Sequence, residues 1–180
     1  LKASEYYRNE LKPVEPTPPY PSRFDWNKEY WVGASFYLKN YNVNPDSWTT
    51  VMQTHAVPSL LDDGSGKPNW NCCAGDNGWT IHTKYKNGVN KLAFHARRIN
   101  NPMTEVPSCA AIKSGSWEIS LPDYQWMDFV MNFKFSTGSV GFIKMWYNGN
   151  LVVNISGPNV HYLDVCGKPR KQECTLQFGI

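Results

Sequence analysis

Apolar and polar residues alternate with a period of two along much of this sequence, and that period predicts half-buried β-strands. The alternation is clearest over residues 29–38 and 124–136, so both segments are predicted to be core strands. Their predicted core residues are Val32, Ala34, Phe36, Leu38, Met127, Phe129, Met131, Phe133 and Phe135.

Turn signals separate these strands from shorter ones. Asn87-Gly88 and Asn148-Gly149 each stand between two β-prone segments, and this dipeptide favours the tight turn of a β-hairpin. The hairpin strands are predicted at 79–86, 91–99, 141–147 and 151–155, and further strands at 5–11, 117–121 and 175–180. We therefore expect an all-β fold, a two-sheet β-sandwich of the jelly-roll (concanavalin-like) type, with a concave substrate groove.

One β-prone stretch, residues 51–57, places an amide and an imidazole two positions apart. Side chains alternate across a strand, so Gln53 and His55 share one face, while the residues between them are suited to a core. An amide beside a titratable imidazole can bind and deprotonate a substrate. A lone Gln-x-His pair is more often two ordinary surface residues, so its weight depends on the rest of the chain.

Length and charge narrow the class of protein. The chain has 180 residues, enough for one domain with its own core, and its net charge is only +3 at pH 7. A protein that binds nucleic acid normally carries a concentrated basic run, and none is present here. No apolar segment approaches the length of a membrane span. We expect neither nucleic acid nor membrane as a partner.

Basic residues do gather on one predicted face of the first hairpin. His82, Lys84, His95 and Arg97 alternate with mainly apolar neighbours in its two strands. A solvated outer face explains this pattern equally well, because basic residues also serve solubility. On a concave surface, the same residues would attract an acidic polymer.

The cysteine content indicates an oxidising environment. Five cysteines and the sequon Asn154-Ile155-Ser156 are typical of a secreted, glycosylated protein, and we expect an extracellular location. The spacing of the cysteines and histidines does not match a zinc site. No cofactor is expected to be required, and a structural calcium ion is compatible with the sequence.

The disulfide pairing is only partly predictable. The turn-rich segment between Cys166 and Cys174 allows a bridge across it. Cys72 and Cys73 are adjacent and cannot easily pair with each other, so one of them with Cys109 is the second candidate bridge. The fifth cysteine stays unassigned.

Four motifs, in their order along the chain, resemble those of the jelly-roll polysaccharide lyases, the group that includes alginate lyases, glucuronan lyases and heparin lyase I. The run Arg8-Asn9-Glu10-Leu11-Lys12 resembles the family strand Arg-(Ser/Thr)-Glu-(Leu/Val)-Arg, and Gln53-Thr54-His55 resembles the strand Gln-(Ile/Val)-His. Residues 141–149 resemble a family hairpin with a central Trp, and residues 176–180 resemble the closing strand Tyr-Phe-Lys-x-Gly-(Ile/Val)-Tyr.

The resemblance covers nearly the whole chain and implies that residues 1–180 are a single lyase-like jelly-roll domain. It also implies that one or more N-terminal strands and the end of the last strand are lacking. Gln177 stands where the family has Lys, and Asn9 and Lys12 are further departures. The catalytic tyrosine of the family would follow Ile180.

The implied function is that of a secreted lyase that cleaves an acidic, uronate-containing polysaccharide by β-elimination. In this mechanism Gln53 and Arg8 neutralise the uronate carboxylate, and His55 removes the proton at C5 or assists the group that does. Glu10 would orient Arg8. The substrate-binding residues implied or expected are Glu10, His82, Lys84, His95, Arg97 and Gln177.

Two other functions fit the same sequence less well. A non-catalytic glycan-binding or structural extracellular module would keep the basic, aromatic-lined face without turnover, and the departure at Gln177 favours it. A glycoside hydrolase on a similar sandwich would need paired carboxylates on one strand face, and no such run is present.

Overall fold

The computed structural model describes residues 10–11, 23–38, 48–57, 59–66, 69, 78–105, 107 and 113–179. All strands in these residues belong to two antiparallel sheets, as the alternation predicted. No helix occurs in the described part of the chain that is long and apolar enough to cross a membrane.

The larger sheet has seven strands, in the order β1-β11-β4-β5-β6-β7, and β2 pairs with the beginning of β11 while β1 pairs with its end. Because β11 lies next to β4, the end of the described chain lies beside the predicted Gln53/His55 strand. The strands of this sheet are β1 (Glu10–Leu11), β2 (Arg23–Asp25), β4 (Trp48–Ala56), β5 (Trp79–Lys86), β6 (Val89–Arg97), β7 (Lys113–Ser120) and β11 (Glu173–Gly179).

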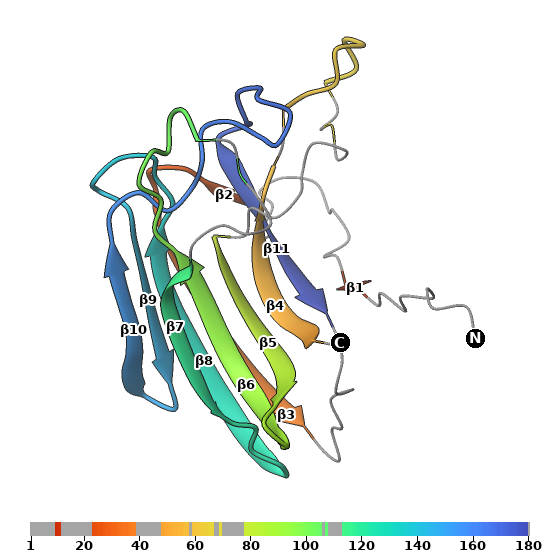
Figure 1. Ribbon diagram of the computed structural model, residues 1–180, viewed down its shortest axis with the longest axis vertical. Coiled ribbons are helices and arrows are strands. Elements are labelled where there is room, and N and C mark those ends of the chain that lie inside the picture. Colours follow the sequence, from red (N-terminus) through yellow and green to blue (C-terminus); the bar gives the residue numbers. More distant parts are fainter. Residues whose placement is uncertain are drawn as a thin grey trace, which may run out of the picture.

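The smaller sheet has four strands in the order β10-β9-β8-β3. Figure 1 shows the two sheets as two layers, with the core between them. The predicted two-sheet β-sandwich is therefore confirmed. The strands of this sheet are β3 (Glu29–Leu38), β8 (Gln125–Lys134), β9 (Phe142–Tyr147) and β10 (Asn150–Ser156).

The core includes the predicted residues of β8, while the predicted core residues of β3, Val32, Ala34, Phe36 and Leu38, are partly buried and pack against it. Met127, Met131 and Phe133 of β8 are completely buried. Aromatic rings from both sheets meet around Phe133, whose ring centroid lies 5.0 Å from that of Phe24 and 5.9 Å from that of Trp79. Edge-to-face contacts of this kind add to the stabilisation from buried apolar area.

The strand boundaries agree with the sequence where the alternation is long. Strands β3 and β5 begin and end at the predicted residues 29–38 and 79–86. Strand β2 was not predicted, because three residues are too few to show a period. Residues 5–9 of the predicted first strand lie outside the described part of the chain.

Both predicted Asn-Gly turns are present. Asn87 and Gly88 have φ angles of 53° and 78°, and Asn148 and Gly149 have φ angles of 46° and 79°. Positive φ at both central residues defines the type I′ turn, whose twist suits a two-residue hairpin. These turns join β5 to β6 and β9 to β10.

The predicted disulfide between Cys166 and Cys174 is wrong. Cys174 lies in β11 opposite Ala56, its side chain faces the core, and its sulfur belongs to no disulfide. Cys166 is disulfide-bonded and lies on an exposed turn before that strand. Strand alternation directs the Cys174 sulfur into the core, away from the turn. Residues 72, 73 and 109 lie outside the described part of the chain.

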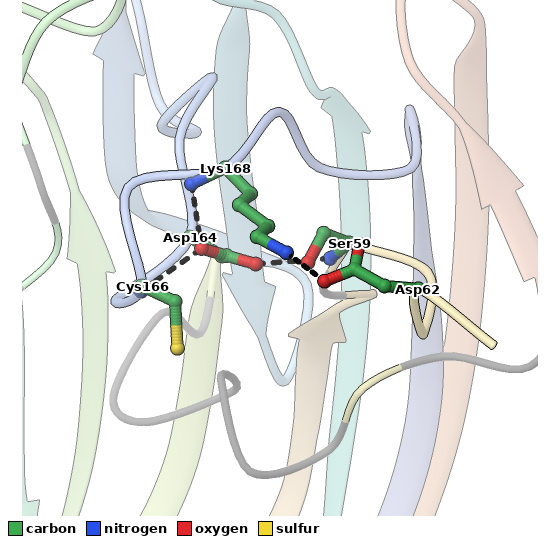
Figure 2. A network of polar contacts seen from close by, with 5 residues as sticks. All are labelled: Ser59, Asp62, Asp164, Cys166 and Lys168. Atoms are coloured by element: carbon green, nitrogen blue, oxygen red, sulfur yellow. Dashed lines mark hydrogen bonds and ion pairs between the residues drawn. The ribbon is translucent and has the colours of Figure 1, made fainter.

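A buried carboxylate attaches this turn to the loop that follows β4, as Figure 2 shows. Asp164 accepts hydrogen bonds from the backbone N–H groups of Ser59 at 3.1 Å, Cys166 at 2.9 Å and Lys168 at 3.0 Å. The ammonium group of Lys168 also pairs with the exposed carboxylate of Asp62. These contacts position the chain as it approaches β11.

Candidate functional site

Gln53 and His55 of β4 point away from the core of the sandwich. Thr54 and Ala56, the neighbours that alternate with them, are completely buried, and Ala56 belongs to the core cluster. Gln53 and His55 therefore lie on what we call the outer face of the seven-stranded sheet. A substrate that reaches this face meets an amide and an imidazole from the same strand.

A second amide from β11 lies directly opposite Gln53. The two residues are register partners, and Nε2 of Gln53 donates a hydrogen bond to Oε1 of Gln177 at 2.9 Å. Gln53 and Gln177 are only 5% and 9% exposed, so this bond fixes the orientation of both amides. Each carboxamide carries two N–H donors, and the bond between them uses one. The pair is suited to bind a carboxylate.

His55 is half-buried beside this amide pair. Its Nδ1 lies 3.4 Å from the carbonyl oxygen of Ala56. A proton on Nδ1 can be donated to that oxygen, and this tautomer leaves the lone pair on Nε2, as a general base requires. The hydroxyl of Thr175, the register partner of His55 on β11, donates to the His55 carbonyl oxygen at 3.4 Å.

The predicted basic residues of the first hairpin lie on the same outer face. The rings of His82 and His95 stack with a centroid distance of 4.6 Å and an interplanar angle of 13°. Thr80 is the register partner of both Gln53 and His95, so His95 lies on the same face two strands from Gln53, and His82 lies on β5, the strand between them. The structure thus brings together residues that the sequence placed in separate strands.

Lys84 shares this face, but its charge has a partner that the sequence did not reveal. Its Nζ lies 2.5 Å from Glu118 of β7, and Lys86 lies 3.7 Å from the same carboxylate. The hydrogen bond from Lys84 holds the pKa of Glu118 below its ordinary value against partial burial, and the charges of Lys84, Lys86 and Lys91 add to this effect. In the sequence, only the predicted strand at residues 117–121 indicated where Glu118 would lie.

The remaining predicted site residues are less fully placed. Arg97 follows His95 on the same face and ends β6, where a β-bulge interrupts pairing with β7. Glu10 pairs through its backbone with Gly179 of β11, which brings β1 to the edge beside Gln177. Residue 8 lies outside the described part of the chain.

No metal site accompanies these groups in the part of the chain that the structure describes. Within those residues, no group of three or more His, Cys, Asp or Glu side chains could hold a metal ion. What the outer face does combine is oriented amide donors, an imidazole with one ring nitrogen beside a carbonyl, and several basic side chains. Such a set can bind an anionic group and remove a proton next to it.

Comparison with known sequences agrees with this chemistry. The sequence matches the family model described as polysaccharide lyase over residues 2–180. No curated protein matches the sequence significantly.

Comparison with solved structures shows the same fold. Endo-β-1,4-glucuronan lyase from the fungus Trichoderma reesei has a TM-score of 0.52 at 16% identity, covering 91% of this chain and 65% of that one. Alginate lyase Aly36B has a TM-score of 0.51 at 14% identity, with 87% and 59% covered. A mutant of Aly36B in complex with an alginate trisaccharide has the same TM-score and identity, with 87% and 61% covered. This chain therefore spans less than two thirds of each.

Proposed function

Since the chain belongs to the polysaccharide lyase family, we propose that it cleaves an acidic, uronate-containing polysaccharide by β-elimination on the outer face of the seven-stranded sheet. The observation that carries this proposal is the fixed amide pair of Gln53 and Gln177 with His55 beside it. The glucuronan and alginate lyases of similar fold carry uronate polymers in their names, which supports the substrate class.

The amides address the main obstacle to the reaction. The proton at C5 of a uronate is weakly acidic while the neighbouring carboxylate is charged. Hydrogen-bond donors held in place before the reaction stabilise the charge that develops on that carboxylate, and they need no reorganisation in the transition state. Gln53 is suited to this role because its bond to Gln177 restricts its amide. Arg8 would add a charge-assisted hydrogen bond.

His55 is the proposed base. The C5–H bond breaks, its proton passes to the Nε2 lone pair, and the electron pair is delocalised onto the neighbouring carboxylate. The C4–C5 double bond then forms as the C4–O bond breaks, and the departing oxygen takes a proton from a general acid, the role that the family gives to a tyrosine. A neutral imidazole is a suitable base because its ordinary pKa of about 6.5 lies near neutral pH. The reaction written in this way requires no cofactor.

The stacked histidines and the neighbouring cations extend the proposed binding surface. His82, His95, Lys84 and Arg97 share the outer face, where the charges of Lys84 and Arg97 would attract a polyanion and the imidazoles could form hydrogen bonds with it. Because Glu118 already pairs with Lys84, we assign that lysine a smaller share of the attraction.

We further propose that the protein is extracellular and carries a glycan at Asn154. Asn154 is exposed on β10, the edge strand of the four-stranded sheet, so a glycan there would stand at the edge of that sheet's outer face and would leave the proposed active face uncovered. Mass spectrometry of the protein secreted by a eukaryotic host tests this. Ser156→Ala, which removes the sequon but keeps Asn154, is the matched control and should carry no glycan there.

The proposed activity is tested with glucuronan, alginate and heparin, following the ultraviolet absorbance of the unsaturated uronate product. We expect His55→Ala to lower the rate of product formation by about 100-fold or more, the usual contribution of a general base. Polymer binding should change little, because a base acts mainly in the transition state. Asn154→Ala, on the other sheet, is the control and should retain full activity.

A wild-type protein that binds these polymers but forms no unsaturated product would contradict the lyase proposal. That result would favour a non-catalytic glycan-binding module on the same face. The bond between Gln53 and Gln177 is compatible with that alternative, because amides that hold a carboxylate also serve binding alone.

A further inference from the structure

Large aromatic side chains are exposed on the outer face of the four-stranded sheet. This face lies on the opposite side of the molecule from the proposed active face. Trp31 is 62% exposed, Trp126 is 65% exposed and Tyr37 is 44% exposed. They alternate with partly buried residues in β3 and with buried residues in β8, so they point outward. Exposed apolar groups that gather on one face mark an interaction site.

These rings form two pairs, Tyr37 with Trp126 on the neighbouring strands β3 and β8, and Trp31 of β3 with Trp146 of β9 across the intervening strand β8. The rings of Trp31 and Trp146 stack with a centroid distance of 5.6 Å and an interplanar angle of 23°. The rings of Tyr37 and Trp126 lie 5.4 Å apart at 50°. Trp31 and Tyr37 are six positions apart in β3, which separates the pairs by about 20 Å at the usual rise of a strand.

The surface between the two pairs holds Gly33 and Ser35 of β3 beside their register partners Val130 and Asp128 of β8, and Val130 is 39% exposed. A Cβ on Gly33 would have one backbone oxygen at 3.9 Å as its only contact within 4 Å, so there is space for a ligand close to the backbone here. One step further along β3, the hydroxyl of Ser35 donates to Oδ1 of Asp128 at 2.6 Å. The face therefore combines two aromatic platforms with a lower strip that can accept and donate hydrogen bonds.

A surface with two aromatic pairs and hydrogen-bonding groups between them fits a sugar chain better than a protein partner. A pyranose ring presents an apolar C–H face that stacks on an aromatic ring and an edge of hydroxyls that needs hydrogen bonds. A protein interface would instead bury a continuous apolar centre. We propose that the outer face of the four-stranded sheet binds a linear, neutral glycan, with sugar rings on the two aromatic pairs and hydroxyls on Ser35 and Asp128.

Charge distinguishes this ligand from the proposed substrate. The cations Lys134 and Lys144 on this face are balanced by the anions Glu29 and Asp128, and Asp128 lies between the aromatic pairs. An ionised carboxylate there would repel a uronate and would accept hydrogen bonds from neutral hydroxyls. The two sheets would thus hold different glycans, which would keep the protein on a neutral polysaccharide while it acts on an acidic one.

The test measures binding of cellohexaose by calorimetry and of hydroxyethyl cellulose by affinity electrophoresis, using protein made without N-glycosylation. Trp31→Ala and Trp126→Ala should each weaken binding about tenfold, a usual effect of removing an aromatic anchor. Both residues are exposed, so folding should be retained, and the melting temperature checks this. Tyr85→Ala removes an exposed aromatic ring from the other sheet and should leave binding unchanged.

Two further measurements separate this site from the proposed active face. Binding of the neutral glycan should be insensitive to sodium chloride and unchanged in His55→Ala, whether or not the protein proves to be a lyase. Absence of neutral-glycan binding, or equal affinities of the tryptophan variants and the wild type, would overturn the proposal. So would sedimentation showing a wild-type dimer that Trp31→Ala converts to a monomer, because the face would then bind a second copy of the chain.

Discussion

At the scale of single residues, Asp164 shows how one buried carboxylate organises a loop. Its side chain is completely buried, and three backbone N–H groups donate to it. Burial alone would raise its pKa, but the bonds from Ser59, Lys168 and Cys166 outweigh burial and hold the pKa below its ordinary value. The ionised form is therefore the one that the folded protein stabilises.

We expect Asp164→Asn to lower the free energy of unfolding at pH 7 by about 1–3 kcal/mol, because bonds to a charged acceptor are replaced by weaker ones. A lowered pKa in the folded state means that this stabilisation is present above the unfolded pKa of about 3.9 and is lost as pH falls through the folded value. The difference from the wild type should thus shrink below about pH 4.

Urea unfolding at several pH values measures this difference. Asp62→Asn is the matched control, because it removes an exposed carboxylate of the same network, where an ion pair contributes little. Equal destabilisation by both substitutions, or a difference that does not depend on pH, would contradict the role of the buried charge.

At the scale of elements, the connection from β8 to β9 depends on a close backbone contact. The N–H of Gly157, which follows β10, donates to the carbonyl oxygen of Gly141 at 2.8 Å. A Cβ on Gly141 would lie 2.5 Å from the carbonyl oxygen of Gly157. Backbone cannot move aside as the end of a flexible side chain does, so this contact requires glycine.

Gly141→Ala should therefore lower the free energy of unfolding by about 1–3 kcal/mol, as overpacking usually does. Gly138→Ala is the control in the same connection, because its Cβ would meet only the hydroxyl of Ser136, at an ordinary distance of 3.6 Å. We expect a change within about 0.5 kcal/mol for this variant. Thermal melting of both variants distinguishes the two outcomes, and equal losses would show that the turn is sensitive for another reason.

At the scale of the whole molecule, the two outer faces differ in charge although the net charge is only +3. The seven-stranded sheet presents His82, His95, Lys84 and Arg97, while the four-stranded sheet presents aromatic rings and balanced charges. The position of a charge, and not the total, therefore decides which polymer each face would bind.

We expect the binding of alginate or glucuronan to weaken as salt concentration rises, because charges are screened beyond about 8–10 Å at physiological ionic strength. Glu118→Gln should strengthen this binding by about 2- to 5-fold, since it releases Lys84 from an ion pair of ordinary strength. Asp62→Asn, which removes an exposed carboxylate that pairs with Lys168 and not with Lys84, is the control and should leave it unchanged. Affinity that does not depend on salt would contradict a charge-driven polymer site.

The sequence by itself determined the local structure of this protein. Alternation over residues 29–38 and 79–86 determined where two strands begin and end, and Asn-Gly determined two hairpin turns. The same alternation placed Gln53 and His55 on one face, because a strand turns successive side chains to opposite sides whatever its neighbours are. Where a strand was only three residues long, as in β2, this signal was absent.

Only the tertiary structure decided which strands are neighbours. Gln53 and Gln177 meet across 124 positions of sequence, Lys84 meets Glu118, and Asp164 meets Ser59 across 105 positions. It also decided that the Cys174 sulfur faces the core and does not meet Cys166. Alternation reports which face a side chain occupies, whereas strand order and register depend on how all the strands bury their apolar faces together.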